Sequence, residues 1–267
     1  MITFIVQARF HATRLPGKVL KRVAGKTLLE HLIIRLRRAK TLQSIIVATS
    51  ERPGNEKIVA VAKKLGVLSF AGSEDDVLDR YYQAAKHFKA DTIVRITADC
   101  PLMDPAVVDK VVNFYKRNQK KFDYVSNVRP PTFPDGMDVE VFSFEALERS
   151  FREAKFPSER EHVTAYIGKH PEVFRIGNVT MKPDLSKLRL TVDEPADFRL
   201  ASKIFRTLLL WKPNFTLADI VNLLAVHPEL LRVNAGINRN EGYITSLKED
   251  NALSSSKKQS KLFLDLL

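Results

Sequence analysis

Short apolar runs alternate with longer amphipathic segments through most of this 267-residue chain. Residues 2–8 are continuously apolar enough for a buried strand, and residues 27–39 carry apolar side chains at helical spacing. Further strands are predicted at 45–49, 68–70, 92–97, 124–128, 139–142, 173–179 and 188–192, and further helices at 55–65, 76–88, 105–116, 144–153, 159–169, from 195 onward and at 217–226. The alternation predicts an α/β fold with a mostly parallel central sheet and helices on both faces.

Composition sets the domain organisation. A content of 45% hydrophobic and 28% charged residues is typical of a globular domain. We expect one domain over residues 1–233, followed by a polar C-terminal tail over 234–267 that is partly flexible or is pinned to the surface or to a second subunit.

The chain carries no recognisable export or membrane signal. Its first residues, MITFIVQAR, lack the pattern of a signal peptide, and no segment reaches the roughly 20 apolar residues that a membrane helix needs. A single cysteine, Cys100, can form neither an intrachain disulfide nor a thiolate zinc site. We therefore expect a cytoplasmic protein without a membrane partner.

The net charge of +12 raises the possibility of nucleic-acid binding. The basic residues are scattered over predicted helices, however, as at 35–40 and 116–121, where a solvated face is the simpler explanation. Aromatic and basic residues do not interleave in the manner of single-strand binders. Nucleic-acid binding stays the less favoured alternative.

The loop after the first strand gathers positive charge. Its sequence, QARFHATRLPGK, contains Arg9, Arg14 and Lys18 around a Pro-Gly turn. Ligands of open parallel sheets bind at the carboxyl ends of the strands, where this loop lies. The chain has no GxGxxG motif, and Gly17-Lys18 lacks the Walker spacing. A phosphate group would therefore be held here chiefly by arginine forks and the lysine charge.

Two aspartates stand at the ends of predicted strands. Asp99 ends the apolar run in VRITADCPL, and Asp193 ends the run in LRLTVDEP. Taken alone, each aspartate is more typical of a helix cap. Magnesium, however, binds one or two carboxylates together with phosphate oxygens, so the aspartates and the cationic loop together predict a metal-assisted phosphate site.

Six ordered motifs carry a family resemblance: QARxxxTRLPGKVL, GSEDDVLDRY, RITADCPLMDP, FPDGMDVEVF, EREHVT and LTVDEPADF. In this order they resemble the cytidylyltransferases that activate acidic sugars, with the spore coat polysaccharide (SpsF-like) branch nearest and the CMP-Kdo and CMP-acylneuraminate synthetases further away. The resemblance covers about residues 2 to 210 and implies a nucleotide-diphospho-sugar transferase (glycosyltransferase A-like) fold that uses CTP and Mg²⁺.

The resemblance also implies roles for individual residues. The residues implied in catalysis are Arg14, Lys18 and Asp99. The nucleotide-binding residues are Ala8, Arg9, Arg14, Lys18, Ser73 and Asp75, the sugar-binding residues are Asp135 and Asp138, and the metal ligands are Asp99 and Asp193. A homodimer is implied as well, with residues 135–141 near a shared edge.

In the expected reaction, the cytidylyl group of CTP is transferred to a sugar, most consistently an acidic one. The products are a CMP-sugar, used for cell-surface polysaccharide biosynthesis, and pyrophosphate. One alternative is a catalytically weak sugar-nucleotide-binding relative, because His11 and Ala12 replace a small residue and a serine of the family loop and would set an imidazole against the triphosphate. For His162 the alternatives are substrate orientation and a structural role, and a buried structural role is favoured for Cys100.

Overall fold

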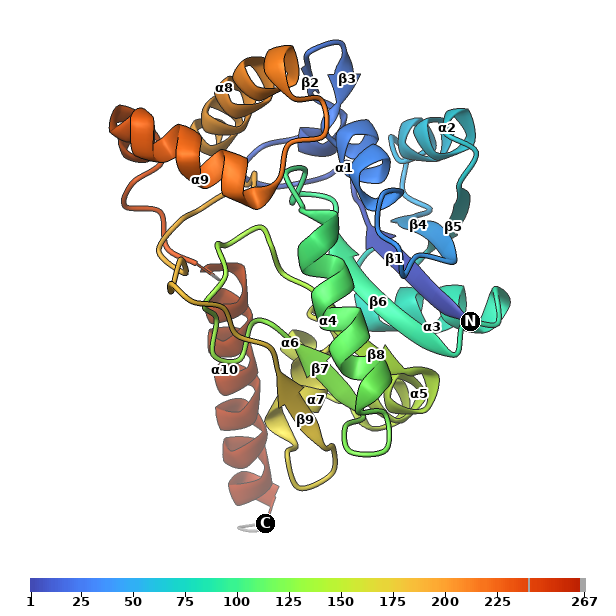
Figure 1. Cartoon of the computed structure of the whole chain (residues 1–267). Helices are drawn as coiled ribbons and strands as arrows, with labels where there is room; N and C mark the ends of the chain where they lie inside the picture. The colour runs from blue at the N-terminus through green and yellow to red at the C-terminus, as the bar shows by residue number, and fades with distance from the viewer. Residues whose placement is uncertain (240, 265–267) are drawn as a thin grey trace.

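A seven-stranded sheet forms the centre of the computed structural model, which describes residues 1–239 and 241–264 (Figure 1). The strand order is β5-β4-β1-β6-β8-β7-β9. The strands are β1 (Ile2–Gln7), β4 (Ser44–Ser50), β5 (Leu68–Gly72), β6 (Thr92–Thr97), β7 (Tyr124–Ser126), β8 (Glu140–Ser143) and β9 (Ile176–Asn178). The first four are mutually parallel, β8 runs antiparallel to β6 and β7, and β9 is parallel to β7. The predicted mostly parallel α/β fold is confirmed.

Helices cover both faces of the sheet. One face packs against α1 (Leu28–Leu36), α2 (Glu56–Lys64), α4 (Pro105–Arg117), α8 (Pro195–Trp211) and α9 (Leu217–Val226). The other packs against α3 (Val77–His87), α5 (Phe144–Glu153), α6 (Pro157–Glu161) and α7 (Ala165–Lys169). Strand β1 serves both cores, because Phe4 and Val6 face one set of helices and Ile5 faces the other.

Short elements complete the fold. A small hairpin, β2 (Arg22–Val23) and β3 (Lys26–Thr27), leads into α1. Two 3-10 turns, η1 (Lys18–Leu20) and η2 (Pro228–Arg232), follow the cationic loop and α9. None of the helices within residues 1–239 and 241–264 has the length and apolar content needed to cross a membrane.

Two predicted elements differ in the structure. The helix predicted at 159–169 is split into α6 and α7, because Val163 between them has a φ of 51° in the left-handed region, which ends a helix. The strand predicted at 188–192 forms only one bridge, between Arg189 and Asp135. A glycine allows this approach: Gly136 has a φ of +99°, and a Cβ atom there would lie 2.5 Å from the Thr191 nitrogen.

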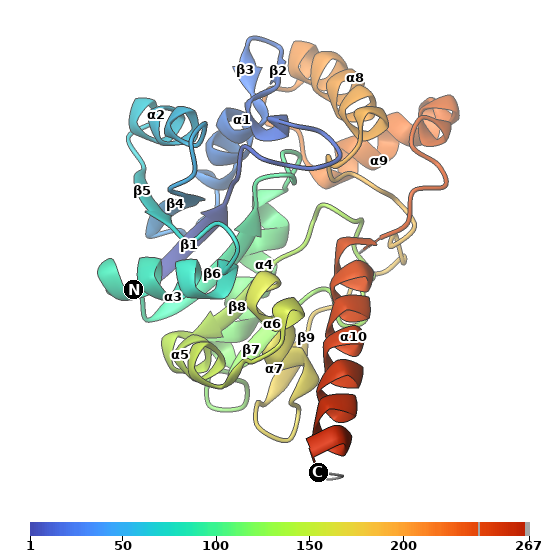
Figure 2. The same ribbon diagram turned by 180° about the vertical axis from the view of Figure 1, so that it is seen from behind.

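The C-terminal segment forms α10 (Glu241–Leu264), which lies beside α6 on the edge of the molecule (Figure 2). Asp250 is buried there, where its carboxylate accepts a hydrogen bond of 3.0 Å from the Ser158 amide and pairs with Lys169 at 3.1 Å. Within the predicted tail, residues 234–239 are turns and irregular structure, and the helix that follows is held against its own chain through Asp250.

Strand β8 lies inside the sheet, between β6 and β7. Asp135 and Val141 are 8% and 0% exposed. Both edges of β8 pair with strands of the same chain, so residues 140 and 141 do not lie at a free edge of the sheet. A subunit interface near residues 135–141 stays a prediction.

Candidate active site

A cleft of about 740 Å³ opens at the carboxyl ends of the parallel strands. Its walls come from the loop after β1, the turn after β6, the junction of α6 and α7, and the first turns of α10. Segments that are distant in the sequence meet here because parallel strands present their carboxyl ends at one edge of the sheet.

Lys18 lies between two of the predicted residues. Its ammonium group is 2.8 Å from Asp99 and 2.5 Å from Asp193, and the residue is 9% exposed. Burial disfavours the charged ammonium, but the two carboxylates outweigh this effect and raise the pKa of Lys18. Burial likewise opposes ionisation of Asp99, yet Lys18 and hydrogen bonds from Thr97 and Cys100 hold the pKa of Asp99 below its ordinary value.

The turn at Gly17 brings Lys18 into this position. Gly17 has a φ of +65° and is followed directly by η1, whose first residue is Lys18. The Gly17 amide donates a hydrogen bond of 2.9 Å to the Phe10 carbonyl, which closes the loop on itself.

The other two loop cations also line the cleft. Arg14 pairs with Asp193 at 3.1 Å, Glu194 at 3.4 Å and Glu241 at 2.9 Å. Arg9 is exposed and makes no hydrogen bond or ion pair with any described residue. Among the described residues, Arg9 is thus unpaired, whereas Arg14 and Lys18 are already neutralised by carboxylates.

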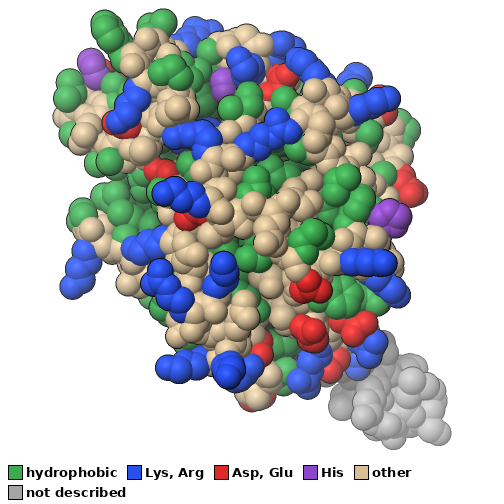
Figure 3. Space-filling model, turned by 45° about the vertical axis from the view of Figure 1, so that its right-hand side comes forward, with side chains coloured by type: hydrophobic (Ala, Val, Ile, Leu, Met, Phe, Trp, Pro, Cys, Tyr) green, Lys and Arg blue, Asp and Glu red, His purple; other side chains and the backbone are tan. Residues whose placement is uncertain are grey.

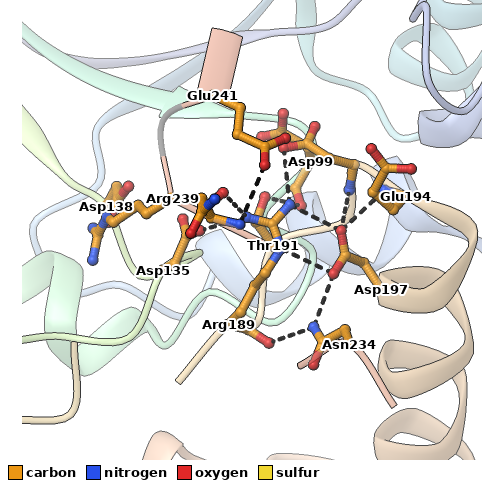
Figure 4. A network of polar contacts seen from close by, with 12 residues as sticks. Asp99, Asp135, Asp138, Arg189, Thr191, Glu194, Asp197, Asn234, Arg239 and Glu241 are labelled. Atoms are coloured by element: carbon orange, nitrogen blue, oxygen red, sulfur yellow. Dashed lines mark hydrogen bonds and ion pairs between the residues drawn. The ribbon is translucent and has the colours of Figure 1, made fainter. Parts of the chain in front are cut away.

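Arg189 also contacts the second aspartate, Asp193, and Figure 4 shows Arg189 between Asp135 and Asp197. Its guanidinium group contacts Asp135 at 2.9 Å, Asp193 at 3.4 Å and Asp197 at 3.0 Å. Asn234 donates a further hydrogen bond of 2.8 Å to Asp197. Sequence reasoning missed Arg189 and Asp197, although their spacing from Asp193 across the start of α8 was visible.

The two predicted sugar-binding aspartates also line the cleft. Asp138 accepts a contact of 2.5 Å from Arg239, and Asp135 pairs with Arg189. Burial raises the pKa of Asp138 to about 7, although Arg239 opposes the shift. Burial also raises the pKa of Asp135 against the influence of Arg239 and Arg189.

A second group of charges lines the cleft on the β8 side of the sheet. Arg95 of β6 pairs with Glu140 of β8, which also accepts hydrogen bonds from Tyr124 at 2.5 Å and Thr164 at 2.6 Å. Burial opposes ionisation of Glu140, but Arg95 and these hydroxyl groups lower its pKa. The Arg95 Nε atom is buried without a hydrogen-bond partner among the described residues. Arg95 and Glu140 each interrupt a predicted apolar strand, and this signal in the sequence was not used to predict the site.

The remaining predicted nucleotide-binding residues divide into two groups. Ala8 lines the cleft, and its amide donates to the Ala48 carbonyl at 3.0 Å. Ser73 and Asp75 lie outside the cleft lining. The Ser73 hydroxyl accepts a hydrogen bond of 3.0 Å from the Asp76 amide at the start of α3, and Asp75 is exposed. From this region Val77 and Arg80 reach the cleft instead.

The structure also shows where the four residues with alternative interpretations lie, namely His162, Cys100, His11 and Ala12. His162 lines the cleft at the junction of α6 and α7, and Cys100 lines it while remaining 3% exposed. His11 is turned away from the cleft, with its Nε2 atom 2.7 Å from the Pro53 carbonyl, whereas Ala12 lines the cleft. The imidazole at position 11 therefore does not occupy the space between the loop cations.

Comparison with known proteins decides the family. The cytidylyltransferase family model matches residues 3–254. The chain belongs to the cytidylyltransferase family. The match extends into α10, beyond the region of residues 2 to 210 on which the resemblance was based.

Individual proteins similar to this one match most of the chain. A spore coat polysaccharide biosynthesis protein, SpsF of Bacillus subtilis, is 30% identical over 85% of this chain and 95% of its own length. An uncharacterized protein of Methanocaldococcus jannaschii is 38% identical over 88% of this chain and 95% of its own. The solved structure of a cytidylyltransferase from Leptospira borgpetersenii superposes with a TM-score of 0.84 at 33% identity, covering 89% of this chain and 99% of that chain.

Proposed function

We propose that this cytidylyltransferase transfers the cytidylyl group of CTP to a sugar hydroxyl, releasing pyrophosphate. The observation that carries the proposal is the convergence of Asp99 and Asp193 on one cation, inside a cleft that also holds Arg9 and Arg14. Two carboxylates and a group of cations at the carboxyl edge of a sheet suit a bound triphosphate and its counterion.

The donor set fits Mg²⁺. The carboxylates of Asp99 and Asp193 are brought together by Lys18, and the described residues contain no group of three or more His, Cys, Asp or Glu side chains that could hold a metal alone. Magnesium commonly takes one or two carboxylates and completes its coordination with phosphate oxygens and water. When bound, the ion supplies positive charge to the phosphate oxygens.

The chain's own residues then have separate roles in the transfer. The acceptor oxygen attacks the α-phosphorus, the bond from this phosphorus to the bridging oxygen breaks, pyrophosphate leaves with the electron pair, and the hydroxyl proton passes to a base or to water. Arg9, Arg14 and Lys18 stabilise the charge on the leaving pyrophosphate. Arg189 orients Asp193 through their ion pair.

An acidic sugar is the proposed acceptor. Arg95 and Arg129 both line the cleft. A carboxylate on the acceptor can pair with guanidinium groups of this kind through charge-assisted hydrogen bonds. The similarity to SpsF supports a role in cell-surface polysaccharide biosynthesis.

We also propose that the protein is a homodimer and that it acts in the cytoplasm.

The alternatives have less support. The catalytically weak relative loses one argument, because His11 faces Pro53 and does not crowd the loop cations. Nucleic-acid binding rests on net charge, and Figure 3 shows Lys and Arg side chains spread over the visible face among acidic and hydrophobic ones. On this face the basic side chains do not form the continuous stripe of a nucleic-acid interface.

The decisive experiment measures pyrophosphate release from CTP in the presence of Mg²⁺ over a panel of acidic sugars, with ATP, GTP and UTP as alternative nucleotides. We expect release with CTP and at least one sugar. An absence of release with every nucleotide and sugar would overturn the enzymatic proposal. Binding to DNA or RNA that falls steeply with added salt would support the nucleic-acid alternative.

A further inference from the structure

We propose that α10 forms a wall of the acceptor subsite, where Tyr243 and Ser246 determine which sugar is accepted. The inference rests on the proposed function and extends it to a segment that the sequence motifs did not include. Tyr243, Thr245, Ser246 and Glu249 of this helix all line the cleft.

The start of α10 is fixed to both sides of the site. Glu241 pairs with Arg14 of the cationic loop at 2.9 Å. Two residues earlier, Arg239 contacts Asp138 and also donates a hydrogen bond of 3.3 Å to the Phe133 carbonyl. Further along the helix, Asp250 is held by Ser158 and Lys169. The residues between these anchors are thus positioned on the cleft rather than left free to move over it.

Ser246 joins α10 to the junction of α6 and α7. It is 4% exposed, its hydroxyl donates to the Glu161 carboxylate at 2.7 Å, and the same oxygen lies 3.1 Å from the His162 Nε2 atom. The oxygen also lies 3.1 Å from the Gly242 carbonyl. Burial lowers the pKa of His162 although Glu161 opposes the shift, so the imidazole is mainly neutral at pH 7. Ser246 therefore orients the His162 ring in the cleft.

Tyr243 adds an aromatic surface and a free hydroxyl group. Its ring meets the His162 ring edge to face, with centroids 5.1 Å apart and an interplanar angle of 83°. The tyrosine is half-buried, and none of the described residues forms a hydrogen bond with its hydroxyl group. A half-buried phenol in a polar cleft is suited to a ligand that offers hydroxyl groups.

The chemistry of this wall matches a hydroxylated ring. The Tyr243 hydroxyl can donate to or accept from a sugar hydroxyl, the His162 ring can form one further hydrogen bond, and Arg95 and Arg129 can meet a carboxylate. Sites that hydrogen-bond a substrate hydroxyl reject analogues that lack it, because the site's own polar groups are then left unpaired. Selection among sugars therefore depends on Tyr243 and on the His162 ring that Ser246 orients.

The test uses the full chain with three single variants. Tyr243→Phe removes the hydroxyl and keeps the ring, Ser246→Ala removes the contact to His162, and Lys248→Ala is the control because Lys248 is exposed and lies outside the cleft lining. Binding of free Kdo and N-acetylneuraminate is measured by saturation-transfer NMR in the presence of CTP, and CTP affinity is measured by calorimetry.

We expect Tyr243→Phe and Ser246→Ala each to weaken sugar binding by about tenfold, as for the loss of one to two hydrogen bonds, and to change CTP affinity by less than about twofold. Lys248→Ala should behave as the parent. Where turnover is measurable, the same two variants should raise the KM for the sugar and alter the order of preference among sugars.

The outcomes separate this proposal from the proposed function. Sugar binding unchanged in both variants overturns the role of α10 while leaving the transferase proposal intact. Sugar binding by the parent without pyrophosphate release overturns the transferase proposal, and the variants still test α10 through binding. A parent chain that binds neither sugar overturns the assignment of α10 to an acidic-sugar subsite.

Discussion

Asp99 and Asp193 end different segments of the chain, yet their carboxylates share one cation, the ammonium group of Lys18. Neutralising either carboxylate removes a proposed metal ligand. We expect Asp99→Asn and Asp193→Asn each to lower kcat/KM by about a hundredfold or more, because charge stabilisation of the transferring phosphoryl group is lost. Pyrophosphate release measures the effect, and circular dichroism checks the fold. Activity equal to that of the parent in both variants would show that the metal assignment is wrong.

Removing the Lys18 ammonium group should destabilise the protein, because Asp99 and Asp193 then repel each other. Lys18→Met leaves two facing carboxylates without their counterion, so we expect the free energy of unfolding at pH 7 to fall by about 3 kcal/mol. Millimolar Mg²⁺ should then raise the midpoint of thermal unfolding more in Lys18→Met than in the parent, because the ion can take the place of the ammonium group. The double variant Lys18→Met with Asp99→Asn should lose most of this response. Equal responses to Mg²⁺ in all three proteins would contradict the predicted site.

Glu241 and a bound triphosphate should compete for Arg14. Their ion pair is 2.9 Å long but partly exposed, with 36% and 40% of the two side chains accessible, so its strength is modest. Glu241→Gln should tighten CTP binding by about threefold, as measured by calorimetry. Glu249→Gln is the matched control, since Glu249 lines the same cleft from the same helix and forms no ion pair with the described residues. Tightening of the same size in both variants would indicate a general charge effect instead of competition.

Asp138 should make stability depend on pH in a defined direction. Burial raises its pKa from an ordinary 3.8 to about 7, against the influence of Arg239. Between these values the native state keeps a proton that the unfolded state has lost, so the contribution of Asp138 to stability falls as pH rises from about 4 to about 7 and is constant above. The unfolding midpoint of the parent minus that of Asp138→Asn should follow this curve.

Glu51→Gln provides the control, because Glu51 is exposed and lies outside the cleft lining. The unfolding midpoint of the parent minus that of Glu51→Gln is measured over the same pH range. A difference between the parent and Asp138→Asn that stays constant from pH 4 to pH 8 would mean that the native carboxyl group titrates normally.

Several features followed from the sequence because they depend on local pattern. Continuous apolar strands between amphipathic helices predicted the α/β fold, and parallel strands place their carboxyl ends together, which predicted that Asp99 and the cationic loop would meet. The break at Val163 escaped prediction, because a β-branched residue rarely adopts a positive φ and nothing in its neighbours signals one. The strand predicted at 188–192 failed because an apolar run fits either a strand or an extended segment packed beside a loop.

The sequence by itself determined the succession of strands and helices along the chain, the family, and the residue types available at the carboxyl edge of the sheet. Only the tertiary structure decided that Lys18 bridges two carboxylates, that Arg189 holds Asp193, and that α10 enters the cleft. Hydrophobic periodicity reports which face of an element is buried, whereas α10 is fixed by single polar contacts, such as that of Asp250 with Lys169, that leave no periodic signal. The partners of a charged side chain depend on how distant segments pack, and this is settled only when the whole chain has folded.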